Sequence, residues 1–369
     1  MPWNWESKSW PNFTYSLESI ESRLNDFYFH SGKLLGINQL ITKDTSQNLR
    51  LEIITDEALK TSEIEGEYFN RESVQSSIQK QFGLKATSRR PSAAEYGIAE
   101  MMVDLYQSSQ EPLNHEKLFS WHRMLTNGRR DLEDIGRYRT SPESMQVVSG
   151  PMGKERVHFE GLPSDRVFFE MERFLEWYNT ESRKLHPVVQ AGIAHLYFVC
   201  IHPFEDGNGR IGRAIAEKIL SERLGQPSLI ALSHTIEKYK KQYYEALERN
   251  NKSMEISDWL EYFSETILLA IQRSLNLASF ILAKTRFYDR FRQEMNERQM
   301  KVCERIFQEG PDGFQGGLSL SNYLSITKTS RATATRDLMA LVDLEAFRKT
   351  GELKGTRYFL NWEGLIAEN

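Results

Sequence analysis

Residues 202–213, with the sequence HPFEDGNGRIGR, place a possible base, a possible metal ligand, three glycines and two arginines close together. The neutral imidazole of His202 is suited to take a proton from a hydroxyl near pH 7. Asp206 is suited to hold magnesium, because one carboxylate with phosphate oxygens and waters is a usual environment for that ion. Gly207 and Gly209 leave backbone N–H groups uncovered, and these can bind phosphate oxygens. The segment therefore predicts a site that holds a polyphosphate and deprotonates a group beside it.

The same glycines match two other phosphate-binding patterns, which the surrounding sequence disfavours. Residues 207–212 fit G-x-G-x-x-G, but that fingerprint needs a preceding strand, and residues 196–201 continue a helical pattern. A P-loop needs Lys followed by Ser or Thr, where this chain has Arg213 and Ala214. A helix N-terminus that binds an anion remains, with Arg210 and Arg213 on one helix face as a clamp for a triphosphate.

The segment also resembles the Fic signature HxFx(D/E)GNGRxxR at every position. The resemblance extends from about Ala93 to Thr266 and includes the segment Gly136–Arg139. Most Fic proteins transfer AMP from ATP to a protein hydroxyl, so the resemblance implies a protein adenylyltransferase acting on Ser, Thr or Tyr of a target protein. It implies a mainly α fold, in which a Fic-type helical bundle carries a β-hairpin flap. Homodimers are common among such proteins, and we expect one here.

The resemblance also implies roles for single residues. His202 would be the catalytic base, and Asp206 would hold Mg²⁺ on the α- and β-phosphates of ATP. Arg210 would hold the β/γ region of ATP, and Arg213 the γ-phosphate. The flap would pair with an extended target segment by strand addition. The nucleotide-binding positions implied are Val157, His158, Gly207, Asn208, Gly209, Arg210, Ile211, Gly212, Arg213, Tyr243, Tyr244 and Asn251.

Two parts of this assignment leave alternatives open. The insertion at 150–156 makes the flap alignment of Val157 and His158 ambiguous. Tyr243 and Tyr244 lie in a helical pattern, where tyrosines also serve as plain packing residues. A zinc site at His195, Cys200 and His202 is disfavoured, because the spacing suits no familiar site and a fourth ligand is missing.

Glu65 is an acidic residue on an otherwise apolar helical stripe that includes Ile54, Ala58 and Thr61. A carboxylate on a buried stripe needs a cation, unless the helix frays before Gly66 and leaves the carboxylate in water. Residues 61–66, TSEIEG, resemble the inhibitory motif (S/T)xxxE(G/N) found N-terminal to many Fic cores. The resemblance implies that Glu65 pairs with Arg213 and denies it to the γ-phosphate. In some Fic proteins the same glutamate supports removal of AMP, and that alternative stays open.

Bulk composition limits the remaining function classes. The chain has 369 residues, enough for two or three domains, and a formal net charge of −4, which gives no general reason to expect nucleic acid or acidic membranes as partners. The two cysteines fit a reducing compartment. The N-terminal residues lack a signal-peptide pattern, and no apolar run suggests a membrane span. We expect a cytoplasmic protein.

Periodicity and turns, taken together with the resemblance to Fic proteins, predict three domains: 1–92 with the inhibitory helix, 93–295 as the Fic core, and 296–369 as a winged-helix domain. Within the core, strands at 145–150 and 156–159 form the hairpin, and one helix covers 235–250. We expect the winged-helix domain to bind either DNA or a protein. The alternative to an adenylyltransferase is a regulator in which the Fic site tunes this domain. Basic candidates for DNA contacts, interrupted by Glu345 and Glu352, are Arg331, Arg336, Lys349, Lys354 and Arg357.

Overall fold

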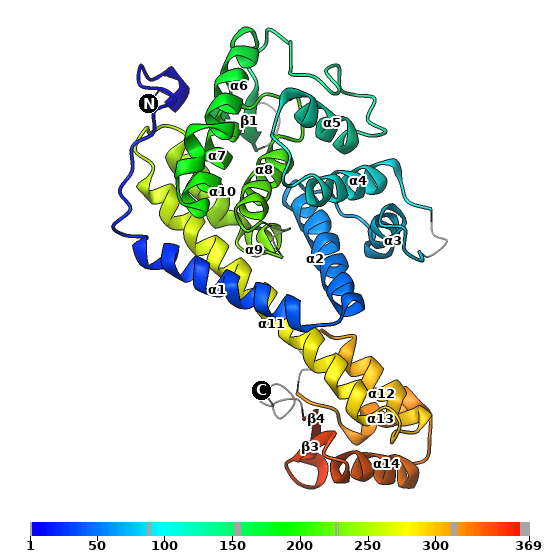
Figure 1. Cartoon of the computed structure of the whole chain (residues 1–369). Coiled ribbons are helices and arrows are strands. Elements are labelled where there is room, and N and C mark those ends of the chain that lie inside the picture. The colour runs from blue at the N-terminus through cyan, green and yellow to red at the C-terminus, as the bar shows by residue number, and fades with distance from the viewer. Residues whose placement is uncertain are drawn as a thin grey trace. The chain divides into compact units, whose positions relative to one another are not determined.

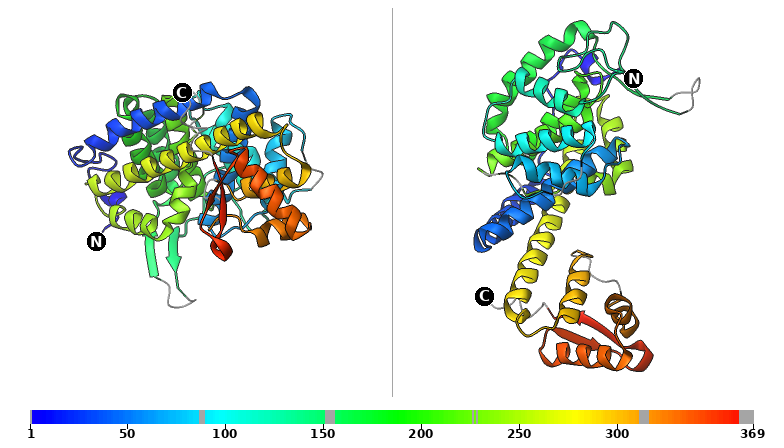
Figure 2. Two further views of the ribbon diagram at one scale, coloured as in Figure 1. Left: turned by 90° about the horizontal axis from the view of Figure 1, so that it is seen from below. Right: turned by 90° about the vertical axis from the view of Figure 1, so that its right-hand side faces the viewer.

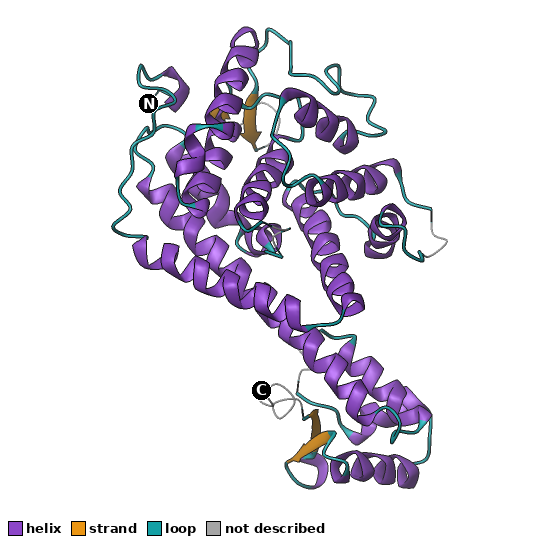
Figure 3. Ribbon diagram, in the orientation of Figure 1, coloured by secondary structure: helices purple, strands orange, loops and turns teal. Residues whose placement is uncertain are grey.

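The computed structural model describes residues 2–86, 90–150, 156–225, 227, 229–310 and 316–361. Helices dominate these residues, and the strands are few and short (Figure 3). The chain forms two compact units, one of Met1–Gly32 with Arg50–Ser274 and one of Lys33–Leu49 with Leu275–Asn369 (Figure 1). The mainly helical fold predicted from the sequence is confirmed.

Three long helices contribute residues to both units: α1 (Glu21–Leu40), α2 (Lys43–Ile64) and α11 (Ser257–Phe291). Each compact unit is therefore made of two separate stretches of the sequence. The domain limits 1–92, 93–295 and 296–369 stay predictions.

Two adjacent helices, α7 (Pro187–Ile201) and α8 (Asn208–Arg223), lie at the centre of the larger unit (Figure 1). Nearly all side chains of α7 are buried, as expected for a helix that is apolar on every side. A Cβ atom at Gly212 would lie 3.1 Å from Val199 and 3.3 Å from His195, so glycine permits the close packing of the two helices. This packing fixes both ends of the segment HPFEDGNGRIGR.

Six further helices pack around this pair or on one another. The helix predicted over 235–250 is in fact two helices, which meet at Tyr239, where φ is −115°. One of the six, with the sequence RESVQSSIQKQ, was not predicted, because its few apolar residues give a weak periodic signal. The six are α3 (Arg71–Gln81), α4 (Ala93–Gln107), α5 (His115–Leu125), α6 (Ser164–Asn179), α9 (Leu232–Lys238) and α10 (Lys240–Asn250).

A two-stranded antiparallel hairpin extends from this unit, formed by β1 (Gln146–Ser149) and β2 (Arg156–Glu160) (Figure 2). The pairing follows the predicted hairpin. Its register shifts between Val147 and Val148, so that His158 is the extra residue of a bulge in β2. A bulge changes the direction in which neighbouring side chains point, and it does so here beside the segment 202–213.

The smaller unit contains a cluster of three helices and a second hairpin: α12 (Glu297–Phe307), α13 (Leu320–Thr327), α14 (Arg331–Asp343), β3 (Phe347–Thr350) and β4 (Arg357–Leu360). Its core includes Val302, Leu338, Leu341 and Phe347. The carboxylate of Asp337 joins the three helices, because it accepts hydrogen bonds from Arg298 (2.8 Å) and Tyr323 (3.0 Å). The winged-helix identity of this unit and its partner stay predictions.

One described helix, α11, is long and apolar enough to cross a membrane by length and composition alone. Its most apolar stretch has a mean hydropathy of 1.5, and 44% of that stretch is buried inside the molecule. Trp259, Phe263 and Ile267 of this helix are fully buried. A core helix of a soluble protein passes the same test, so this helix does not overturn the expectation of a protein without a membrane span.

Candidate active site

A cavity of about 630 Å³ lies between the end of α7, the start of α8, the first hairpin and α10. Its volume falls in the range of small-molecule sites, about 300–1,000 Å³. The structure brings most of the predicted site residues to this cavity. Those that line it are Glu65, His158, His202, Asp206, Gly207, Asn208, Gly209, Tyr243, Tyr244 and Asn251.

His202 follows the last residue of α7 and has a left-handed backbone conformation, with φ 53° and ψ 58°. Its Nδ1 atom lies 3.1 Å from the carbonyl oxygen of Val199. A carbonyl only accepts hydrogen bonds, so Nδ1 carries the proton and Nε2 keeps a free lone pair. Burial lowers the pKa of His202 to about 4, so the ring is neutral at pH 7. The side chain thus has the tautomer and charge that a general base needs.

Arg139 holds the turn that carries His202. Its Nε donates to the carbonyl of His202 (2.8 Å), a second guanidinium nitrogen donates to the carbonyl of Leu162, and its backbone N–H donates to Pro203 (3.0 Å). The side chain is 4% exposed. The sequence analysis included Arg139 in the resemblance but gave it no role, because nothing in its spacing indicates a contact across 63 residues.

Asn208 closes the loop between His202 and α8. Its Nδ2 donates to the carbonyl of Phe204 (2.8 Å), and its Oδ1 accepts from the N–H of Phe204 (2.9 Å). Gly207 has φ 83°, which favours glycine. The amide of Asn208 therefore satisfies buried backbone groups of the loop, a role that the sequence analysis did not predict. A contact of the same side chain with phosphate stays a prediction, and only its remaining amide hydrogen is available for it.

Asp206 carries a charge that other residues hold in place. Its Oδ2 accepts from Arg129 (2.6 Å), its Oδ1 accepts from the N–H of Gly207 (2.6 Å), and Arg210 lies 3.5 Å away. Burial raises the pKa of Asp206, but Arg210 and Arg129 lower it by more, so the carboxylate is ionised. The sequence analysis did not single out Arg129.

Asp206 fits Mg²⁺ as a single carboxylate ligand, as predicted, and not as part of a larger cluster of protein ligands. No group of three or more His, Cys, Asp or Glu side chains that could hold a metal ion exists among the described residues. The Asp206 side chain is 35% exposed and lines the cavity. One accessible carboxylate is what Mg²⁺ needs when substrate phosphates and waters supply the other oxygens.

The C-terminal turn of α2 places two carboxylates beside α8. The N–H of Glu67 donates to Ser62 and that of Gly66 to Glu63, both at 3.0 Å, and Gly66 has φ 87°. These bonds form a Schellman motif, which ends the helix at a defined point. The helix does not fray at Gly66, so the alternative that Glu65 lies free in water is wrong.

Glu65 contacts Arg213, as the resemblance implied. Its Oε1 accepts from Nη2 of Arg213 at 2.7 Å, and Arg213 also donates to the side chain (2.9 Å) and carbonyl (2.8 Å) of Thr61. Arg213 is 2% exposed. The Glu65 carboxylate lies so close to Gly209 that a Cβ atom there would clash with it. The carboxylate therefore lies at the positive end of α8, where the predicted site binds an anion.

Glu67 contacts the other arginine, which the sequence analysis did not foresee. Nη1 of Arg210 donates to Oε2 of Glu67 at 2.5 Å, and Arg210 is 4% exposed. The two arginines of α8 are thus paired with two carboxylates from one helix-ending turn. The available signal was the glutamate directly after Gly66 in the sequence EIEGE.

Tyrosines and an asparagine on the α10 side of the cavity serve as structural contacts. The Tyr243 hydroxyl lies 2.9 Å from Nε2 of His195, and Tyr243 is 1% exposed. The Tyr244 hydroxyl donates to the carbonyl of Ile64 (3.2 Å), the last residue of α2. Asn251 donates to the carbonyl of His158 in β2 (3.1 Å). Their predicted contacts with nucleotide stay predictions.

Five predicted nucleotide-binding residues do not line the cavity: Val157, Arg210, Ile211, Gly212 and Arg213. Val157 is 38% exposed, and its neighbour His158 lines the cavity. Ile211 is fully buried, and Gly212 faces α7. The contacts of these residues with a nucleotide stay predictions. The two arginines are covered by Glu65 and Glu67.

The buried residues proposed as a zinc alternative do not form a metal site among the described residues. Burial lowers the pKa of His195 to about 4, and its ring packs against the neighbouring rings of Trp259 and Phe263, with each centroid 5.7 Å away. The Cys200 thiol accepts a hydrogen bond from Asn4 (3.1 Å), and burial raises its pKa to about 12. Both are core residues.

Comparison with known families explains this combination of base, loop and arginines. Residues 112–220 match the Fic/DOC family. Residues 3–84 match a domain of unknown function (DUF4172), which covers α1, α2 and the turn with Glu65. The residues that match the Fic/DOC family include His202, Asp206, Arg210 and Arg213.

Two curated relatives are similar to part of this chain. One is protein adenylyltransferase Fic of Drosophila mojavensis, 42% identical over 111 residues, which are 29% of this chain and 21% of the relative. The other is protein adenylyltransferase fic-1 of Caenorhabditis elegans, 28% identical over 170 residues, 46% of this chain and 30% of the relative. The chain thus spans between a fifth and a third of the length of these relatives.

Two solved structures share the fold. A Fic family protein from Desulfovibrio desulfuricans superposes with a TM-score of 0.54 and 20% identity, covering 95% of this chain and 98% of that one. A Fic domain containing signaling protein from Bacteroides thetaiotaomicron gives a TM-score of 0.53 and 22% identity, covering 69% of this chain and 95% of that one. At these identities the likeness supports the fold alone.

Proposed function

We propose that this chain is a protein adenylyltransferase that transfers AMP from ATP to a Ser, Thr or Tyr hydroxyl of a target protein. The observation that carries the proposal is His202, a neutral base with a free Nε2 beside the anion-binding end of α8. The curated relatives that are similar to part of this chain are adenylyltransferases by name. The hairpin of β1 and β2 offers its strands to an extended target segment.

In the proposed reaction, Nε2 of His202 takes the proton of the target hydroxyl. The hydroxyl oxygen then attacks the α-phosphorus of ATP, and the bond from that phosphorus to the bridging oxygen breaks. Pyrophosphate leaves, and AMP stays on the target. Asp206 would hold Mg²⁺, which supplies positive charge to the phosphates. The chain mainly positions groups and stabilises charge, as phosphoryl-type transfers require.

Glu65 and Glu67 restrain this activity in the proposal. Arg213 would hold the γ-phosphate, but its guanidinium already contacts Glu65 at 2.7 Å. Arg210 would hold the β/γ region, but it contacts Glu67 at 2.5 Å. Two carboxylates occupy the positions of two anionic ligand groups. ATP must displace them, or bind with its phosphates misplaced for attack.

The direct test uses the Glu65→Gly protein with labelled ATP, GTP, CTP and UTP, followed by mass spectrometry of the modified chains. We expect adenylyl groups from ATP and far less labelling by wild type. The matched control carries Glu65→Gly with His202→Ala and should give no label. Equal labelling with and without His202 would contradict the proposed base. Labelling from another nucleotide alone would contradict ATP as the donor.

Removal of AMP is a second candidate activity of the same site. The observation that favours it is that the Glu65 carboxylate, 30% exposed, and His202 line one cavity, where a water between them could attack an AMP ester. The test mixes self-adenylylated Glu65→Gly protein with wild type and measures AMP release. Release that depends on Glu65 supports this activity, and its absence excludes it for that substrate.

Nucleic-acid binding is a candidate function of the smaller unit. The observation that favours it is that Arg331 and Arg336 of α14 are both exposed. The full chain should bind duplex DNA with a steep salt dependence, and Arg331→Gln with Arg336→Gln should reduce it. The control pair Arg130→Gln and Lys184→Gln, exposed residues of the other unit, should not. No binding at low salt favours protein docking. A homodimer and a cytoplasmic location also stay predictions.

A further inference from the structure

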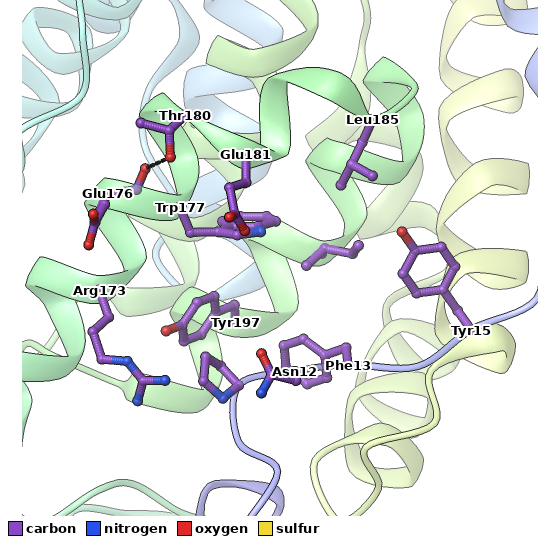
Figure 4. A pocket seen from close by; sticks show the side chains of 12 residues that line it. Asn12, Phe13, Tyr15, Arg173, Glu176, Trp177, Thr180, Glu181, Leu185 and Tyr197 are labelled. Carbon is purple, nitrogen blue, oxygen red and sulfur yellow. Dashed lines mark hydrogen bonds between the residues drawn. The ribbon is translucent and has the colours of Figure 1, made fainter.

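A second pocket lies in the larger unit, apart from the candidate active site. It measures about 540 Å³ and is formed by residues 11–15, the end of α6, the short 3-10 helix Glu181–Lys184 and α7 (Figure 4). It shares no lining residue with the cavity that contains His202. One helix serves both, because α7 presents Ile193 and Tyr197 here and Leu196 and Val199 to the other cavity.

Aromatic rings form the walls of this pocket. Phe13 and Tyr197 meet edge to face, with ring centroids 6.0 Å apart, and Trp177 meets Tyr197 in the same way at 5.9 Å. Tyr15 lies at the opposite end from Arg173 (Figure 4). The faces of aromatic rings carry negative partial charge and attract cations. A cluster of such rings in one pocket favours an organic cation.

Two carboxylates add negative charge to the same pocket. Glu176 and Glu181 line it and are exposed (Figure 4). Across the described ranges, neither carboxylate has an ion pair. The one arginine of the pocket does not compensate them. Its guanidinium lies 3.3 Å from both carboxylate oxygens of Glu170 and 5.8 Å from the ring of Phe169.

A buried polar group in the wall points to a ligand independently. The Tyr197 hydroxyl has no hydrogen-bond partner among the described residues, although the residue is 2% exposed. Burial raises the pKa of Tyr197, so the hydroxyl keeps its proton. Leaving a buried hydroxyl unpaired costs free energy. A ligand with a polar atom near the ring cluster would remove that cost.

We propose that this pocket binds an organic ammonium cation, such as a choline-like group or an alkylated lysine side chain. An anion would be repelled by Glu176 and Glu181. A neutral apolar ligand would remove water from both carboxylates without replacing it. An ammonium group with alkyl substituents satisfies both walls, because its charge faces the carboxylates and its methyl groups contact the rings.

The test compares ligands of equal shape by calorimetry on the full chain. Choline is set against 3,3-dimethyl-1-butanol, which has the same shape and no charge. We expect choline to bind at least about tenfold more tightly, as cation–π and carboxylate contacts together predict. A peptide with trimethyllysine, compared with free choline, shows whether the cation comes from a protein or a small molecule. Equal binding of choline and its neutral counterpart, or no binding, overturns the proposal.

Variants locate the site. Glu176→Gln with Glu181→Gln should weaken choline binding about tenfold, whereas Glu116→Gln with Glu172→Gln, which removes the same charge elsewhere in the unit, should not. Tyr197→Phe keeps the ring and should change affinity by less. Thermal unfolding checks that all variants fold. Equal loss in both double variants would mean a general charge effect and would overturn the assigned site. None of these readouts depends on AMP transfer.

Discussion

The two ends of the candidate active-site cavity differ in what their functional groups already contact. At one end, His202 is neutral and keeps Nε2 free, because its other ring nitrogen donates to the backbone. At the other end, Glu65 lines the cavity and is paired with Arg213, and Glu67 is paired with Arg210. The residue proposed as the base is neutral, while the arginines expected to bind phosphates are already paired.

This difference shows how inhibition can act on the arginines and leave His202 unchanged. A base is set by the burial and backbone of its own loop, so changing it would disturb α7 and α8 together. The carboxylates come from a separate helix end, α2, held by the turn at Gly66 and by the Tyr244 hydroxyl on Ile64. Under the proposed function, displacement of that turn releases both arginines and leaves His202 as it is.

Loss of the base should give the largest effect. We expect His202→Ala to lower the rate of AMP transfer by ~10²–10⁴-fold, the usual contribution of a general base. The rate should be measured in the Glu65→Gly background, where transfer is high. ATP binding, measured by calorimetry, should survive, because the arginine end is unchanged. A loss of ATP binding as large as the loss of rate would break the distinction between the two ends.

Removal of the first carboxylate should act in the opposite direction. We expect Glu65→Gly to raise transfer and self-labelling by ~5–150-fold, the range of typical coupling energies between sites. Arg213 is nearly fully buried, and an unpaired buried charge is unfavourable, so the guanidinium freed from Glu65 should bind the γ-phosphate. Glu63→Gln is the matched control, since Glu63 lies in the same turn but pairs with Lys60. Wild-type activity in Glu65→Gly would disprove the restraint.

The support of the base end can be weakened without touching the imidazole. Lys carries its donors on one nitrogen at the end of the side chain, so Arg139→Lys should weaken the contacts with the carbonyls of His202 and Leu162 that two separate guanidinium nitrogens make. We expect a loss of stability of ~1–3 kcal/mol. The rate constant kcat should fall by about tenfold and KM by much less, since a misplaced base lowers the chemical step. A change in KM alone would show that Arg139 affects ATP binding and not the position of His202.

The second carboxylate should give a smaller release. Glu67 is 33% exposed, so solvent weakens its pair with Arg210, and Glu67→Gln should raise transfer by about two- to fivefold. In a double-mutant cycle, the effects of Glu67→Gln and Glu65→Gly on the rate of transfer should not add, because one turn carries both residues. Strict additivity would show that the two carboxylates act separately. A decrease would mean that Glu67 supports the reaction.

The sequence predicted part of each end of this comparison. The base, the loop and the pairing of Glu65 with Arg213 follow from local motifs and from a resemblance to Fic proteins. Arg139, Arg129 and Glu67 were missed because their partners lie 63, 77 and 143 residues away, and spacing says nothing about such contacts. The bulge in the hairpin was also missed, because a one-residue shift of register leaves no mark in the alternation of residue types.

The smallest expected effect is that of pH on the rate, which tests the His202 end alone. Burial lowers the pKa of His202 to about 4, so the base stays neutral and the Glu65→Gly rate should be flat from about pH 6 to 8. It should fall only as pH drops toward 4. Protons also bind the unfolded histidine more tightly, so stability should decline between about pH 6.5 and 4. The measurement is kcat against pH, with thermal unfolding beside it. A midpoint near 6.5 would show that His202 is solvated and not held as a buried neutral base.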